Sequence, residues 1–261
     1  MLQLLKVEWL KVKNYNTFWI LSFLYLVSVF GANYIAYLTS NVAPKNNDVK
    51  MIIGTPFNFP DVWHVVSYTS SFLMFVPGLL IIISFTNEYS YKTHRQNIID
   101  GWSRKEFILV KMVLAVIVAL AATLAVFITA IAFGLYENPG AFTLEKVEYV
   151  GFFFVQALSY CSVALLFSLL FKRSGITIGV YFLYTLILEN MLAGFLNRYA
   201  GNIGRYLPLE TTDNLIRVPF LKVIINQFMA SYNTTALLLM SVVYLVLYVL
   251  ISMRKFQTDD L

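Results

Sequence analysis

Long apolar runs alternate with shorter polar segments along the whole chain. Six of these runs contain 21 to 24 residues. At 1.5 Å per residue such a helix is about 32–36 Å long, which is sufficient for a bilayer core of about 30 Å. The runs are too long, and too uniformly apolar, for barrel strands of about ten alternating residues. The predicted spans are Thr17–Leu38, Val65–Thr86, Met112–Leu135, Tyr149–Phe171, Ile176–Leu196 and Asn233–Met253.

Composition strengthens this interpretation. The chain is 59% hydrophobic and 13% charged, whereas about 25% charged residues are typical of a soluble domain. We therefore expect an all-α, polytopic membrane protein in which residues 1–261 form a single transmembrane domain.

Positive charges indicate the orientation. With the N-terminus inside, the inner segments contain twelve Lys and Arg in 53 residues, and the outer segments contain seven in 75. Basic residues are enriched on the cytoplasmic side of membrane proteins, so both termini are expected in the cytoplasm. Topology and anionic lipid then account for the net charge of +5, and we expect no nucleic-acid partner.

Residues 1–16 precede the first span and have their own pattern. Lys6 and Lys13 flank an apolar helical face, and Trp9 on that face suits headgroup depth. We expect an amphipathic helix in the membrane interface; the alternative is a simple inward extension of the first span. Asn14-Tyr15-Asn16-Thr17 favours a break between the two, because Asn and Thr cap helix starts better than they sustain helices. The first apolar run is too long for a cleaved signal peptide, so we expect it to be retained. The apolar face consists of Leu2, Leu5, Trp9 and Val12.

The polar segment 87–111 between spans two and three carries five of the nineteen Lys and Arg residues. Ser103 and Glu106 have the spacing of a capping box, which predicts a helix start. Asp100-Gly101 predicts a turn just before it. Glu88 and Lys92 are spaced i, i+4 and would favour a helix, either continuous with span two or separate. The segment is either a cytoplasmic docking surface or a basic loop that anchors two helices to anionic lipid.

The outer segment 197–232 is long and rich in apolar residues, which is unusual for a solvated loop. Pro208 and Pro219 divide it into pieces too short to cross the bilayer. Two short re-entrant helices are expected, buried against protein. The alternative is a small extracellular cap.

Within the spans, Glu189 is the one Asp, Glu, Lys or Arg residue. An ionisable group in a membrane needs a partner or a wet cavity, so Glu189 either lines a pathway or lies at the outer interface where span five ends. Gly175 and Gly179 form a G-x-x-x-G pattern that allows close helix approach. Span five is therefore the predicted contact between two copies.

The sequence offers little for chemistry. The single cysteine, Cys161, lies within a span, and His64 and His94 are expected on opposite sides of the membrane. No metal-ligand spacing, phosphate-binding loop or nucleophile elbow is present in the sequence. We expect no catalytic residue, no metal and no cofactor in this chain.

The layout resembles the permeases of type-2 ATP-binding-cassette exporters. Those permeases have an interfacial N-terminal helix, six spans and a polar loop with Glu, Thr, Ser-Arg and Lys in order. Here Glu88, Thr93, Ser103-Arg104 and Lys111 follow that order. Where the family often has Gly before the Thr and Pro near the Ser-Arg, this chain has Lys92 and Gly101-Trp102.

The resemblance implies an exporter subunit in a bacterial inner membrane. Two permease chains, identical or different, would pair, and two separate ATPase subunits would bind the ATP and contact the loop and the N-terminal helix. By location and charge, the expected ATPase-coupling residues are Glu88, Lys92, Arg95, Arg104 and Glu106.

Two other function classes fit an apolar, six-span chain. An ion-coupled secondary transporter would need ionisable groups in several spans and is favoured by inverted repeats, which inspection does not find. A membrane immunity or assembly factor would not transport at all. Whether transport occurs, and whether it depends on ATP, separates the exporter subunit from these two classes.

Overall fold

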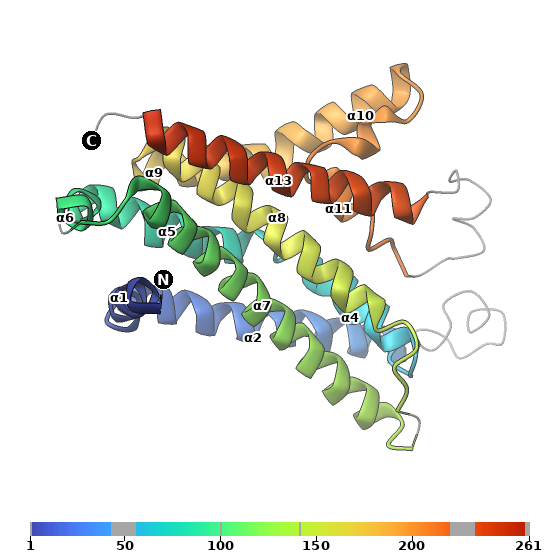
Figure 1. Cartoon of the computed structure of the whole chain (residues 1–261). Coiled ribbons are helices and arrows are strands. Elements are labelled where there is room, and N and C mark those ends of the chain that lie inside the picture. The colour runs from blue at the N-terminus through green and yellow to red at the C-terminus, as the bar shows by residue number, and fades with distance from the viewer. Residues whose placement is uncertain (1, 43–55, 100, 141, 220–232, 259–261) are drawn as a thin grey trace.

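The computed structural model describes an all-helical chain over residues 2–42, 56–99, 101–140, 142–219 and 233–258 (Figure 1). Five helical stretches are long and apolar enough to cross a membrane. The expected all-α, multi-pass architecture is confirmed. The five are α2 (Asn16–Val42), α7 (Arg104–Glu137), α8 (Glu148–Phe171), the continuous stretch Ser174–Tyr199, and α13 (Thr234–Thr258).

Helix α8 is the centre of the bundle. It is the most buried of the long helices and packs against α7, α13 and the two halves of the second span. In Figure 1 it runs through the middle of the molecule, with α13 on one side and α7 on the other. Helices α2 and α13 leave most of their surface exposed, as expected of helices whose outer faces contact lipid or another subunit.

The second predicted span is broken, and the prediction of one uninterrupted helix for Val65–Thr86 is wrong. It consists of α4 (Asp61–Ser71) and α5 (Phe75–Ser90), which are bent by 49° relative to each other. Pro77 explains the position of the break. It has no N–H to donate to the carbonyl of Leu73, and its ring clashes with that carbonyl in a continuous helix.

The fifth span is helical throughout but changes winding in the middle. Helix α9 (Ser174–Leu183) continues through a π-helical turn, Tyr184–Leu188, into α10 (Glu189–Tyr199). A π-turn inserts an extra residue and shifts the faces of the helix on either side of it. In this way Glu189 is buried, although most of the surrounding helix is exposed.

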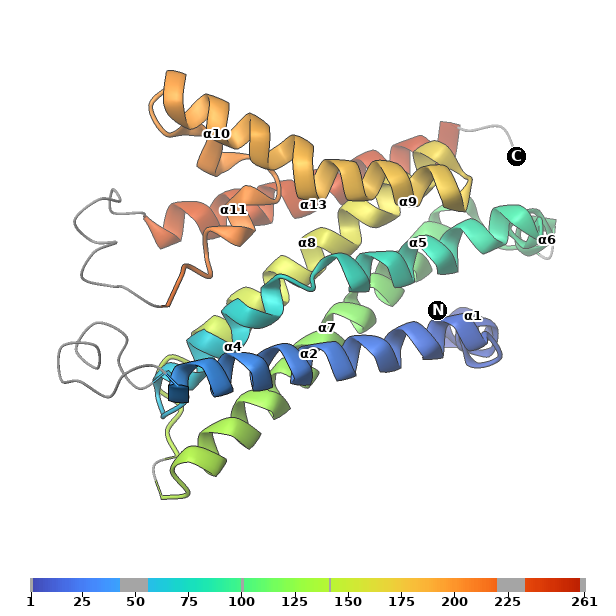
Figure 2. The same cartoon turned by 180° about the vertical axis from the view of Figure 1, so that it is seen from behind.

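At the N-terminus, α1 (Leu2–Lys13) is a separate helix. The chain breaks at Asn14 and Tyr15 before α2 begins, and α1 turns away from the axis of α2 (Figures 1 and 2). The expected break is confirmed, and the alternative of a straight inward extension of the first span is wrong.

After α10 the chain doubles back. A 3-10 turn, η2 (Ile203–Tyr206), packs against α10, and the short helix α11 (Glu210–Asp213) packs against α13 and α8. Gly204 permits this return, because a Cβ there would lie 2.3 Å from the carbonyl oxygen of Ala193. In Figure 2 α11 lies against the first half of α13. The second predicted outer helix, beyond Pro219, lies outside the described residues.

Candidate functional site

Four charged side chains meet where α1, α5 and α7 converge, and we call them the charge cluster: Glu8, Lys11, Glu88 and Lys111. The Lys111 Nζ lies 2.5 Å from the Glu8 Oε2 and also pairs with the Glu88 Oε1. The Lys11 Nζ lies 2.8 Å from the Glu8 Oε1 and 3.1 Å from the Glu88 Oε1. Each lysine therefore bridges both carboxylates, and the cluster is neutral.

The charge cluster is buried, which makes its ion pairs costly to break. Lys111, Glu8 and Glu88 expose between 2% and 4% of their surface. Burial raises the pKa of the Glu8 carboxyl, but the ion pairs with Lys111 and Lys11 outweigh burial and leave that pKa below its ordinary value of 4.5. Because an unpaired charge at such a site is very unfavourable, none of the three segments can separate without disrupting the others.

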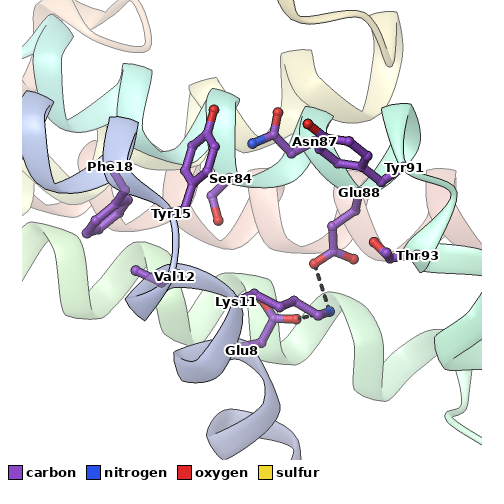
Figure 3. A pocket seen from close by; sticks show the side chains of 10 residues that line it. All are labelled: Glu8, Lys11, Val12, Tyr15, Phe18, Ser84, Asn87, Glu88, Tyr91 and Thr93. Atoms are coloured by element: carbon purple, nitrogen blue, oxygen red, sulfur yellow. Dashed lines mark hydrogen bonds and ion pairs between the residues drawn. The ribbon is translucent and has the colours of Figure 1, made fainter.

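A cavity of about 190 Å³ lies beside the cluster, between α1 and the end of α5 (Figure 3). Figure 3 shows Glu8 and Lys11 reaching from α1 toward Glu88, while Tyr15, Ser84 and Asn87 line the opposite part of the wall. Apolar packing does not fill this space, and the Lys11–Glu88 ion pair joins α1 to α5 beside it.

A short helix, α6 (Thr93–Ile99), projects from this junction. Lys92 has φ 56 and ends α5, so the expected Glu88–Lys92 helical pair does not form, and α6 is a separate helix rather than a continuation. The His94 ring nitrogen Nδ1 lies 2.9 Å from the Glu88 carbonyl oxygen. The burial of His94 thus fixes α6 against the end of α5.

The far end of α6 is closed by a Schellman-type turn. The N–H of Trp102 donates to the Asn97 carbonyl, and the N–H of Gly101 donates to Ile98. Gly101 has φ 99, a conformation that favours glycine. The predicted capping box is confirmed, since Ser103 accepts from the Glu106 N–H and Glu106 accepts from the Ser103 N–H.

The five residues expected to contact an ATPase fall into two groups. Lys92, Arg95 and Glu106 are exposed, and Glu106 also completes the capping box. Arg104 is partly buried and donates to the carbonyl of Gln257 at the end of α13. Glu88 lies in the charge cluster, where the surrounding helices cover it. Its carbonyl oxygen lies against the ring of His94 in α6.

Sequence reasoning missed two features of this region. One is the pairing of Glu8 and Lys11 with the loop, because their partners are 77 to 103 residues away. The other is the apolar surface around α6, where Tyr91 is 74% and Ile99 is 78% exposed. The presence of Tyr91 and Ile99 in a basic loop was the sequence signal that could have revealed this apolar surface.

At the opposite end of the bundle, Glu189 is buried and accepts hydrogen bonds from the N–H groups of Leu209 at 2.5 Å and Glu210 at 3.2 Å. It therefore holds the returning segment against span five. Asp213, which sequence reasoning overlooked, accepts from Gln156 and Tyr160 of α8 at 2.8 Å and 3.1 Å. A carboxylate in the outer segment thus reaches the central helix.

The remaining predicted residues face outward. Lys6, Trp9 and Lys13 are exposed on α1. Gly175 and Gly179 are exposed on α9, and a Cβ on either would meet nothing within 4 Å. Neither glycine therefore packs closely against another described part of the chain. Among the described residues, no three His, Cys, Asp or Glu side chains are grouped so that they could hold a metal ion.

Five apolar spanning helices and a bent sixth define a multi-pass membrane protein, with charged residues at both ends of the bundle. Residues 4–188, well over half of the chain, match the family described as ABC-2 family transporter protein. The chain belongs to this family and is a permease of an ABC-type transporter. A search of curated proteins finds no match.

Proposed function

We propose that this permease is the membrane subunit of an ATP-driven exporter in a bacterial inner membrane, with both termini in the cytoplasm. The observation that carries the proposal is α6, a short projecting helix with an exposed Arg95 and Ile99. The family implies a separate ATPase, and α6 has the mixed basic and apolar surface suited to docking it.

Motion of the ATPase would reach the spans through the charge cluster. A displacement of α6 acts on the end of α5, and the Glu88–Lys111 and Glu8–Lys111 pairs couple α5 to α7 and α1. Because the pairs are buried, the three segments would move as one body. The permease would then switch between two arrangements without chemistry of its own.

The proposed exporter contains two permease chains and two ATPase subunits. Two permease chains would enclose the pathway, with the exposed Gly175 and Gly179 of α9 as the predicted dimer contact. Two ATPase subunits would bind from the α6 side. The permease itself would hold no ATP.

A pull-down with the ATPase tests the docking surface. The Arg95→Glu and Ile99→Asp variants should each reduce recovery of the co-expressed ATPase at least tenfold and abolish ATP-dependent transport in liposomes. The matched control is Arg198→Glu, an exposed charge reversal at the other end of the bundle, which should bind normally. Normal ATPase recovery with both α6 variants would remove α6 from the mechanism.

The ion-coupled alternative gains one observation. Glu189, Glu210 and Asp213 are gathered between α8, α10 and α13, so more than one ionisable group lies in this part of the described chain. Transport driven by an imposed proton gradient, with no ATPase present, would favour that class.

A further inference from the structure

A long apolar groove runs along the outside of the bundle between α2 and α7. Its volume is about 430 Å³; α5 forms its floor and α1 closes one end. These helices lie next to one another in both views (Figures 1 and 2). The side chains used below are Glu8, Trp9, Val12, Trp19, Leu114, Ala121 and Ile128, all of which line the groove.

The chemistry of the lining selects an apolar occupant. Glu8 is its one charged member, and both of its carboxylate oxygens are already paired with lysines. From Leu114 to Ile128 the groove follows α7 for about 21 Å. This exceeds the depth of about 15 Å of one leaflet's hydrocarbon layer, and thus suits a single extended hydrocarbon chain.

The α1 end of the groove has different properties. Trp9 and Trp19 meet edge to face at the mouth, with ring centroids 6.2 Å apart. Both indoles are about half exposed, which is typical of side chains at headgroup depth. The Trp19 indole N–H donates to the carbonyl of Lys13, so this basic residue is held beside the mouth.

Positive charge flanks the same mouth. Lys6 and Lys13 are exposed and lie within about 60° of Trp9 around α1, at 3.6 residues per turn. No ion pair of either lysine is found in the part of the chain that the structure describes. An apolar slot with two available cations at one end is complementary to an amphipathic anion.

We propose that the groove binds one acyl chain of an anionic phospholipid from the leaflet on the α1 side, with its phosphate held by Lys6 and Lys13. The chain packs against Val12 and Trp9 and so holds α1 against α2 and α7. Because Glu8 is on the same helix, the bound lipid also keeps the charge cluster assembled. This proposal requires only that the chain lies in a membrane and is independent of the ATPase.

Tryptophan quenching by brominated acyl chains tests it on the full chain in nanodiscs. A few mole per cent of brominated phosphatidylglycerol in unlabelled phosphatidylcholine should quench more strongly than the same fraction of brominated phosphatidylcholine. Ala121→Phe fills the groove from an exposed position and should abolish this excess. Ala132→Phe, an exposed alanine of α7 outside the groove, should leave it unchanged.

The lysines are tested separately. Lys6→Gln and Lys13→Gln should each weaken the preference for phosphatidylglycerol about fivefold, the effect expected of one basic residue at an anionic surface. Lys105→Gln, also exposed on the same side, should not. Equal quenching by both lipids, insensitive to Ala121→Phe, would mean ordinary surrounding lipid and overturn the proposal. Exclusion of lipid by a second copy, seen as a dimer that Ala121→Phe disrupts, would also overturn it.

Discussion

The two ends of this bundle bury charge in opposite ways. At the α6 end, two carboxylates are neutralised by two lysines within one cluster. At the other end, Glu189 and Asp213 accept hydrogen bonds from backbone N–H groups, an amide and a phenol. In the residues that the structure describes there, neither carboxylate forms an ion pair with a lysine or arginine.

This difference has mechanical meaning. Ion pairs buried between three segments are broken only at high cost, so the α6 end behaves as one stiff junction. Hydrogen bonds to neutral donors are individually weaker and can be exchanged for water. In the proposed mechanism the end with α10 and α11 would therefore rearrange while the α6 end transmits force, and three experiments probe this contrast.

The largest effect is expected for Lys111→Met. The substitution removes the cation that both carboxylates share and leaves only Lys11 to compensate them. We expect a loss of about 3–5 kcal/mol in the free energy of unfolding, as for other broken buried pairs. Thermal unfolding in detergent measures it.

Two controls accompany this variant. Lys105→Met changes an exposed lysine nearer the start of the same helix and should leave the melting temperature unchanged. The double variant Glu88→Leu, Lys111→Met removes opposite charges together and should recover part of the loss, because Glu8 and Lys11 remain paired. A Lys111→Met protein as stable as Lys105→Met would contradict a stiff junction.

A smaller and more local effect is expected for Glu189→Ala. The N–H groups of Leu209 and Glu210 lose their acceptor, at a cost of about 1–3 kcal/mol. Hydrogen exchange should accelerate around α11 and remain unchanged in α1 and α6. The control Glu145→Ala alters an exposed carboxylate of the α7–α8 connection. Faster exchange in α6 would show that the two ends are not mechanically separate.

The smallest effect concerns pH. Because the pKa of Glu8 lies below 4.5 in the folded protein, its contribution to stability is present above that pH and is lost as the pH falls below it. The melting temperature of the wild type should therefore fall more steeply on acidification below pH 4.5 than that of Glu8→Gln. Parallel curves would indicate that Glu8 gains nothing from its ion pairs.

Local patterns in the sequence predicted the fold well. Runs of apolar residues located every span, Asn14-Tyr15 marked the break after α1, and Ser103 with Glu106 marked the start of α7. These signals act over a few residues and depend on helix hydrogen bonding and transfer into lipid. Pro77 was also visible, but its consequence, a 49° bend within a span, depends on how α4 and α5 pack on α8.

The site was less predictable because its pairs are distant in the sequence. Lys111 is paired with Glu8, 103 residues away, and no local periodicity encodes such a pair. Glu88 had been expected to face a partner; its burial follows from the packing of α1 against α7. Asp213 was missed for the same reason, since its donors are on α8.

Helix α7 is continuous over 34 residues, or about 51 Å, and one end of it carries Lys111 in the charge cluster. A rod of that length magnifies rotation: a tilt of about 5° at the base moves the far tip by about 4 Å, given its rise per residue. The neighbouring second span is bent after Ser71. A tilt of one half would therefore not be passed in full to the other half. The third span is therefore the helix best suited to carry a small rotation from one end of the bundle to the other.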